Sequence, residues 1–566
     1  MRIFSFPIIS ALIYLFLGVF NSDLKAQSVQ EIILAEHSYS NQNWEESNNK
    51  YQKLVIDNPY NGEYWYRLAW INHQLSKFEK AKESYLKAIE AGYQLSTSSY
   101  NLACLYSLTN SPDSAVQWLS FSFKNGLQGR ERLINTDSEL DPIRHYPAFK
   151  KLLSAVDHDI VKSRTVSWSE DIQFLKTRFE TTHYNLFSLI DRPSWDNKFD
   201  HLTSNIDLLE DYEIVVKLMQ IVASIEAGHS YVIPPFSGEY QFHQLPIQLS
   251  EFDDGIYIKQ VDENNADIVG YELLSINGHK LSSVIDSVQK VANPENAIMK
   301  RSTSLFYLTL TEVLAAYDLA NELDSIKLTL RKKDGVIIEK TLKSVPFSPE
   351  IVSTRSTLNG WVSMNDKSTF PLPLYLKYPK KAHWFEYVPE TGILYAQLNE
   401  IRNSETATLK EFGEQLKLIS SNNNVSAIIL DLRFNNGGNG LLNKDFLLEL
   451  LEIEQVKTPG QFFTIIGNRT FSAAMLLATQ LDQYTETIFI GEPTGGKPSH
   501  IGDDNHFVLP NSGLMSSASQ TYWQSPVSYD NREWIAPKIY ISMTSEHYLN
   551  NVDPVIKYLE NFFKKD

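Results

Sequence analysis

The sequence has 566 residues, more than one hydrophobic core usually organises, so two to four domains are expected. Hydrophobic residues make up 43% and charged residues 21%, which is ordinary globular usage and argues against disorder. The formal net charge of −17 argues against binding to nucleic acid or to an anionic membrane, because both require a basic face.

The chain begins with the pattern of a secretory signal peptide. Arg2 precedes an apolar run from Ile8 to Phe20, and a polar segment then leads to Ala26, a small residue suited to cleavage. We expect residues 1–26 to be removed during export, which leaves a periplasmic or secreted protein without stable membrane insertion. A membrane anchor is the alternative, but the run is short for a bilayer span of about 20 residues.

Residues 27–155 contain an internal repeat with a period of 34 residues, which brings Ala35, Ala69 and Ala103 into register. Small residues that recur where helices would cross, with aromatic residues beside them, resemble tetratricopeptide repeats. Three such units are about the minimum for a self-supporting stack. The region is interpreted either as a groove for a peptide or protein partner, or as a rigid spacer or dimerisation surface.

The single cysteine, Cys104, lies within these repeats and has no partner for an intrachain disulfide. It falls on an apolar helix face. We therefore expect a buried structural thiol and no catalytic role for it.

Two regions of different pattern follow. Residues 156–240 are predicted to be helical, with an apolar stripe that Gly228 is placed to end. Residues 241–346 contain short alternating runs that predict strands, interrupted by a helical insertion near residues 292–323. The run from Gly270 to Gly278 closes with Asn-Gly and resembles a segment of PDZ domains.

Residues 347–566 alternate between strand and helix patterns. Short apolar runs at 393–398, 427–432 and 462–466 are typical of buried strands, and helical segments lie between and after them. This alternation predicts an α/β layer with parallel strand pairs.

Two turns in this last region could carry chemistry. A buried strand runs through Asp431 into Gly437 and Gly438, whose exposed N–H groups can hold an anion, although an ordinary strand-end turn has the same pattern. At the second turn, Ser472 stands where a strand ends and a helix begins. A serine there is often only a helix N-cap. Its hydroxyl could instead face a cleft, with the Ala473 N–H stabilising an oxyanion.

Together, Asp-Leu-Arg-x-Asn-x-Gly-Gly and the later Thr-Phe-Ser-Ala-Ala resemble the core of tail-specific (C-terminal processing) serine peptidases and the related tricorn core. The resemblance covers Trp168 to the C-terminus. It implies an α+β and α/β serine peptidase core with a PDZ-like β-rich insertion. With the repeats that precede it, the expected fold is a multidomain chain of all-α repeats followed by this core. Ser472 would be the nucleophile, and Ala473 with Gly437 or Gly438 would form the oxyanion hole.

The resemblance offers two general bases. Lys497 matches the lysine that follows the serine in tail-specific peptidases, and His229 matches the Gly-His-Thr/Ser segment of the tricorn-like branch. A lysine must be desolvated to accept a proton at neutral pH, whereas a histidine needs a partner that fixes its tautomer. The closing segment, Tyr529–Pro537, implies a supporting carboxylate, for which Asp530 ranks ahead of Glu533. The choice between the two bases stays open.

We therefore expect an exported serine endopeptidase that hydrolyses peptide or unfolded protein substrates through an acyl-enzyme on Ser472. The PDZ-like part would recognise a substrate C-terminus by strand addition. The alternative function is a catalytically inactive binding module on the same fold. A third hypothesis is an esterase. No metal or cofactor is implied, because the sequence has no cluster with ligand spacing and no phosphate-binding glycine loop.

Overall fold

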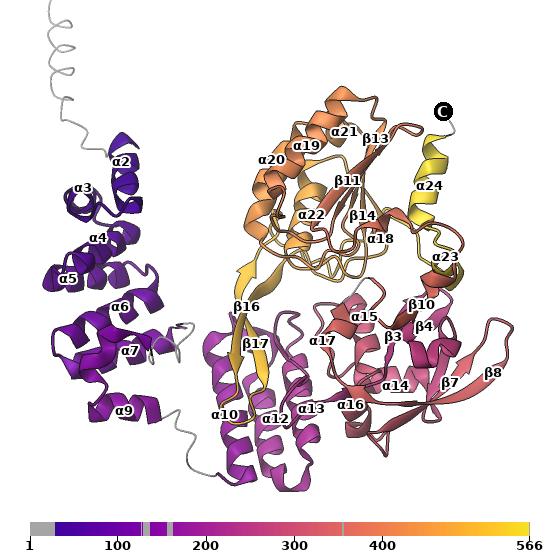
Figure 1. Ribbon diagram of the computed structural model, residues 1–566, viewed down its shortest axis with the longest axis horizontal. Helices are drawn as coiled ribbons and strands as arrows, with labels where there is room; N and C mark the ends of the chain where they lie inside the picture. Colours follow the sequence, from indigo (N-terminus) through magenta and orange to yellow (C-terminus); the bar gives the residue numbers. More distant parts are fainter. Residues whose placement is uncertain (1–28, 126, 128–135, 155–161, 354–355, 565–566) are drawn as a thin grey trace, which may run out of the picture. The chain divides into compact units, whose positions relative to one another are not determined.

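The computed structural model describes residues 29–125, 127, 136–154, 162–353 and 356–564 (Figure 1). The chain divides into two compact units, Met1–Val161 and Lys162–Asp566. The predicted signal peptide lies outside the described residues. Among the described residues, none of the helices combines the length and the apolar character that a bilayer span needs.

The first unit is a stack of helices in which each helix packs against the next. Ala35, Ala69 and Ala103 are fully buried, because small side chains let neighbouring helices approach closely. The predicted helical repeats are thus confirmed. The helices are α2 (Val29–Ser40), α3 (Trp44–Asp57), α4 (Gly62–Gln74), α5 (Phe78–Glu90), α6 (Leu95–Leu108), α7 (Pro112–Lys124), the 3₁₀ turn η1 (Ser138–Ile143) and α9 (Pro147–Ser154).

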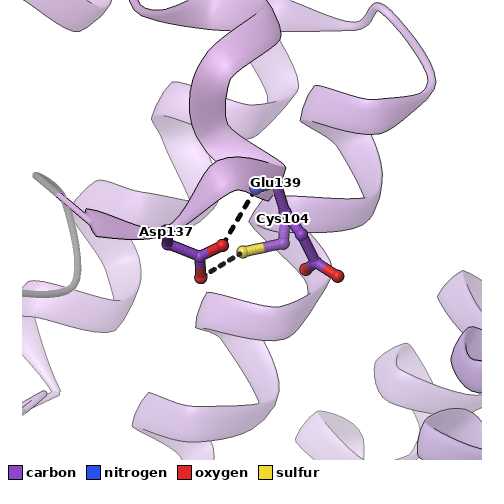
Figure 2. Close-up of side chains that lie close together, drawn as sticks. All are labelled: Cys104, Asp137 and Glu139. Carbon is purple, nitrogen blue, oxygen red and sulfur yellow. Dashed lines mark hydrogen bonds between the residues drawn. The ribbon is translucent and has the colours of Figure 1, made fainter.

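Cys104 on α6 is buried, as the apolar pattern predicts. Its thiol donates to Asp137 across 3.8 Å (Figure 2). Burial, together with the carboxylates of Asp137 and Glu139, raises the pKa of the Cys104 thiol well above its ordinary value. Asp137 also accepts hydrogen bonds from the Tyr100 hydroxyl and the Glu139 N–H, both at 2.9 Å. The protonated thiol therefore helps to fix η1 against α6.

The second unit begins with a helical layer built from α10 (Arg164–Thr182), α12 (Arg192–Ser204) and α13 (Asp211–Ala223). Trp168, Phe179 and Trp195 fill its core. A long hairpin of β16 (His500–Val508) and β17 (Met515–Trp523) extends from the α/β layer to these helices (Figure 1). The short strand β1 (Tyr231–Val232), which follows α13, pairs with β17. The hairpin thus joins the helical layer to the α/β layer.

A β-rich part follows, in which β4 and β5 form the centre of an antiparallel sheet. The predicted Asn-Gly turn joins β5 to β6, with positive φ at both Asn277 and Gly278 as a tight hairpin requires. Three helices stand between β6 and β7, and the last two of them fall within residues 292–323, where the helical insertion was expected. The elements are β3 (Ile247–Phe252), β4 (Gly255–Asp262), β5 (Glu272–Ile276), β6 (His279–Lys280), α14 (Leu281–Val288), α15 (Ala297–Tyr307), α16 (Thr311–Ala316), β7 (Ser325–Arg331), β8 (Ile337–Lys343) and β10 (Trp361–Ser363).

The α/β layer is a six-stranded sheet that is parallel except for its first strand. Its strands are β11 (His383–Val388), β12 (Ile393–Leu398), β13 (Ala427–Asp431), β14 (Phe462–Ile466), β15 (Ile488–Gly491) and β18 (Ile539–Tyr540). One face packs against α19 (Leu409–Asn422), α20 (Asn443–Leu451) and α22 (Ala473–Tyr484), and the other against α24 (Pro554–Phe563). The predicted fold class is confirmed, and the loops after β13 and β14 meet at one edge of the sheet.

Candidate active site

Ser472 occupies the turn between β14 and α22. Its backbone has φ 53° and ψ −126°, a conformation that non-glycine residues rarely adopt and that is concentrated at functional sites. Comparable strained strand-to-helix turns hold the nucleophile of other hydrolases above the sheet. The Ser472 side chain makes no capping hydrogen bond to α22, so the N-cap alternative does not account for it.

His229 faces this serine from the segment between α13 and β1. Its Nε2 atom lies 2.9 Å from Ser472 Oγ, a hydrogen-bond distance. The imidazole stacks with the rings of Phe471 and His500, with centroid separations of 4.6 and 5.8 Å. These contacts fix the ring plane in the orientation that a general base needs.

The segment around His229 is anchored at the next residue, Ser230. Ser230 Oγ lies 2.8 Å from Ser519 Oγ on β17, and the Asn293 side-chain amide donates to the Ser230 carbonyl. Gly228 permits close packing here, because a Cβ at that position would lie 2.8 Å from Glu295 Cγ and 3.0 Å from Phe471 Cζ. Gly228 does not end the helix as predicted, since α13 stops at Ala223, but it makes room for a carboxylate.

That carboxylate, Glu295, is the third polar member of the cluster. It lies between α14 and α15 with a side chain only 4% exposed, and its Oε1 stands 3.3 Å from His229 Nδ1. The contact is within ion-pair distance, and neither of these two buried atoms has a hydrogen-bond partner in the described part of the chain. Glu295 Oε2 accepts the Lys497 backbone N–H at 3.2 Å. The carboxylate is thus positioned to fix the tautomer of the histidine.

Glu295 raises the basicity of its partner. Burial opposes protonation of the His229 imidazole, but the close contact and charge of Glu295, with smaller contributions from Asp504 and Asp503, outweigh it. The pKa of His229 is consequently raised above its ordinary value. The arrangement favours an imidazolium once the ring has accepted a proton.

The predicted oxyanion donors lie beside the serine. The Gly438 and Ala473 N–H groups have no hydrogen-bond acceptor among the residues that the structure describes, whereas the Gly437 N–H donates to Asn435 Oδ1 at 2.9 Å. Gly437 has φ +110°, and a Cβ there would lie 2.6 Å from Ser472 Cβ. The sequence left Gly437 and Gly438 as alternatives for the second oxyanion donor. Gly438 is the one whose N–H is available to an oxyanion.

The other two predicted residues have different partners. The Lys497 ammonium forms an ion pair with Glu533 at 2.9 Å, so only the backbone of Lys497 contacts the cluster. Asp530 accepts hydrogen bonds from Arg532 and Ser525, and the Arg532 guanidinium lowers the pKa of that carboxyl. The structure brings Ser472 and His229 together, and it brings neither the Lys497 ammonium nor the Asp530 carboxylate to them.

Sequence reasoning missed Glu295. It stands in a Pro-Glu-Asn turn before a helix, where Asn296 caps α15 through the Met299 N–H at 2.9 Å. A polar residue before a helix is ordinarily part of a cap, so nothing local indicates its contact with a distant histidine.

Ser472 and His229 line a cavity of about 1190 Å³. Loops of the α/β layer, strand β3 and helix α15 form its walls. The volume exceeds that of a typical small-molecule pocket, as an extended polypeptide would require.

Residues 62–91 match the family model described as tetratricopeptide repeat. No curated protein matches the sequence.

Three solved structures illustrate the similarity of fold. Mature CPAF complexed with lactacystin is 14% identical over 71% of this chain and 98% of that chain, with a TM-score of 0.52. The photosystem II D1 C-terminal processing protease is 12% identical over 68% and 94%, with a TM-score of 0.33, and the tricorn protease is 13% identical over 72% and 37%, with a TM-score of 0.36. The predicted resemblance is thereby confirmed as a likeness of fold. This conclusion rests on the likeness to CPAF.

Proposed function

We propose that this protein is an exported serine endopeptidase that cleaves peptide or unfolded protein substrates through an acyl-enzyme on Ser472. The observation that carries the proposal is the 2.9 Å contact between Ser472 Oγ and His229 Nε2 in a large cavity. The strained backbone of Ser472 and its lack of a capping role support a catalytic hydroxyl.

The mechanism follows from these contacts. Ser472 Oγ attacks the peptide carbonyl carbon while its proton passes to His229 Nε2. The Gly438 and Ala473 N–H groups stabilise the negative charge on the carbonyl oxygen, and Glu295 stabilises the imidazolium. His229 then gives the proton to the leaving amine as the C–N bond breaks. Water, deprotonated by His229, attacks the ester and restores Ser472.

Peptide recognition by the PDZ-like part, residues 241–346, belongs to the same proposal. Strand β3 lines the cavity and pairs with β4 on one side, with no second strand partner in the described residues. An extended substrate can add to such an edge through main-chain hydrogen bonds. The repeats would bind a protein partner, which deletion of residues 27–155 would remove without loss of hydrolysis.

The test compares the mature chain with its Ser472→Ala variant on a reduced, unfolded polypeptide. We expect cleavage by the parent and loss of at least roughly 10³-fold in the variant. Hydrolysis of small esters without peptide cleavage would indicate an esterase. A folded parent that cleaves neither substrate would indicate a binding module.

A further inference from the structure

Two cationic side chains in the cavity beside Ser472 have no acidic partner among the residues that the structure describes. Lys259 projects from β4, and Arg469 lies in the loop that leads to Ser472. Neither forms an ion pair with any residue that the structure describes. The Lys259 ammonium instead lies 5.7 Å from the centre of the Tyr548 ring.

The other basic side chains of this cavity are neutralised. Arg301 contacts Glu251 at 2.6 Å, and Arg433 is held between Asp431 and Asp553, each at 2.9 Å. Lys259 and Arg469 therefore differ from the remaining cations of the same cavity in lacking a counter-charge.

Leaving these two charges unpaired is unfavourable. Burial lowers the pKa of Lys259 to about 8, with a further lowering from the nearby charge of Arg469, and no carboxylate opposes it. Burial also lowers the pKa of Arg469. Two half-buried cations that line one cavity and lack counter-charges are stabilised when an anion binds to both. In a protein of net charge −17, such a pair indicates a bound ligand that supplies the missing charge.

We propose that Lys259 and Arg469 form a subsite that binds one carboxylate of the peptide substrate. The proposal rests on the peptidase function for the nature of its ligand, because a carboxylate is the anion that an unmodified peptide carries. A guanidinium can bind it through two parallel hydrogen bonds, while the ammonium adds a point charge.

The rest of the cavity favours a single negative charge. Glu492, Asp503 and Asp504 also line it, and burial raises the pKa of Glu492. A polyanion such as a nucleic acid would be repelled by these carboxylates. An isolated carboxylate meets less of this repulsion, because it brings a single negative charge to Lys259 and Arg469. Its source is either an acidic side chain or the free C-terminus of the substrate.

Binding to the full-length Ser472→Ala protein tests the subsite without turnover. Fluorescence anisotropy would measure the binding of labelled peptides in two comparisons. In the first, Glu and Gln are compared at each position of the peptide in turn. In the second, a peptide with a free C-terminus is compared with its C-terminally amidated form. We expect the carboxylate form to bind roughly 10- to 100-fold more tightly in one pair, which identifies the source.

Variants connect that preference to the two cations. Lys259→Gln and Arg469→Gln, each added to Ser472→Ala, should abolish the preference, while Lys259→Arg and Arg469→Lys should retain part of it. Arg301→Gln is the matched control, because it removes one positive charge from the same cavity but one that Glu251 already neutralises. The control should retain the preference.

Three results would overturn the proposed subsite. They are equal binding of acidic and neutral peptides, no binding of any peptide, and a preference that remains in both Gln variants. The parent enzyme separates this failure from that of the peptidase. Cleavage of all peptides without preference would refute the subsite alone, whereas a preference in Ser472→Ala without cleavage by the parent would refute the peptidase alone.

Discussion

His229 Nδ1 and Glu295 Oε1 face each other across 3.3 Å, although one belongs to the segment after α13 and the other to the turn before α15. The contact connects the helical layer of the second unit to its β-rich part. It also sets the protonation behaviour of the base, because Glu295 outweighs the effect of burial on the His229 pKa.

Replacing Glu295 by Gln should lower kcat/KM by roughly 10²-fold or more, because the amide no longer stabilises the imidazolium. The pH profile should shift as well. In the parent, activity rises with pH as His229 loses its proton, at a pKa above the ordinary value of about 6.5. Without the Glu295 charge, burial dominates and lowers the pKa, so the acidic limb of kcat/KM should move to lower pH.

Glu312→Gln is the control for that experiment. Glu312 has the same 4% side-chain exposure and lies 2.8 Å from His243, in an ion pair of the same type. The substitution should reduce stability in a denaturant titration and leave the pH profile in place. An equal shift in both variants would contradict a specific role for Glu295.

The two candidate bases can be separated by Lys497→Met and His229→Ala. The lysine variant should retain activity within roughly threefold of the parent, because an exposed ion pair contributes little and the backbone N–H that holds Glu295 remains. The histidine variant should lose roughly 10⁴-fold in kcat/KM. If Lys497→Met is folded, as judged by circular dichroism, but inactive, the lysine and not the histidine would be the general base.

Gly437→Ala should abolish most activity, by roughly 100-fold or more, because its Cβ would be placed 2.6 Å from Ser472 Cβ and would displace the nucleophile. Gly335→Ala provides the comparison. It has φ +86° with open space around the added Cβ, so it should cost about 1 kcal/mol of stability without affecting hydrolysis. Similar activities of the two variants, measured on one peptide substrate, would contradict the close approach.

Cys104 should react with a thiol reagent at least roughly 10³-fold more slowly in the native protein than in denaturant, since burial keeps it protonated and covered. Because it is the single cysteine of the chain, the absorbance change reports this site alone. Rapid labelling of the folded protein would show that η1 opens readily from α6.

Periodic patterns allowed much of the fold to be predicted. The repeat of small residues at Ala35, Ala69 and Ala103 reflects helix crossings that are local in sequence, and the apolar runs at 393–398 and 462–466 are buried on both faces. The Asn-Gly turn likewise specifies its own geometry through Asn277 and Gly278. Each of these signals is contained within a short segment.

The candidate site was harder to predict from the sequence, because its residues come from distant segments of the chain. Ser472 and the paired glycines are recognisable since each stands in a characteristic turn. The partner of His229 depends on how the β-rich part packs against the helical layer, and no local pattern encodes that contact. The sequence therefore favoured Asp530, which belongs to a recognisable closing segment, and did not indicate Glu295, which lies beside the histidine only in the folded chain.

The β16–β17 hairpin has a consequence for how this protein can be divided. It pairs with β1 and so holds the histidine-bearing segment against a serine that belongs to the α/β layer. Neither part contains a complete proton-transfer pair on its own. A proteolytic cut in the hairpin would thus inactivate the enzyme irreversibly. In any fragment that lacks the helical layer, the serine would have no histidine to accept its proton.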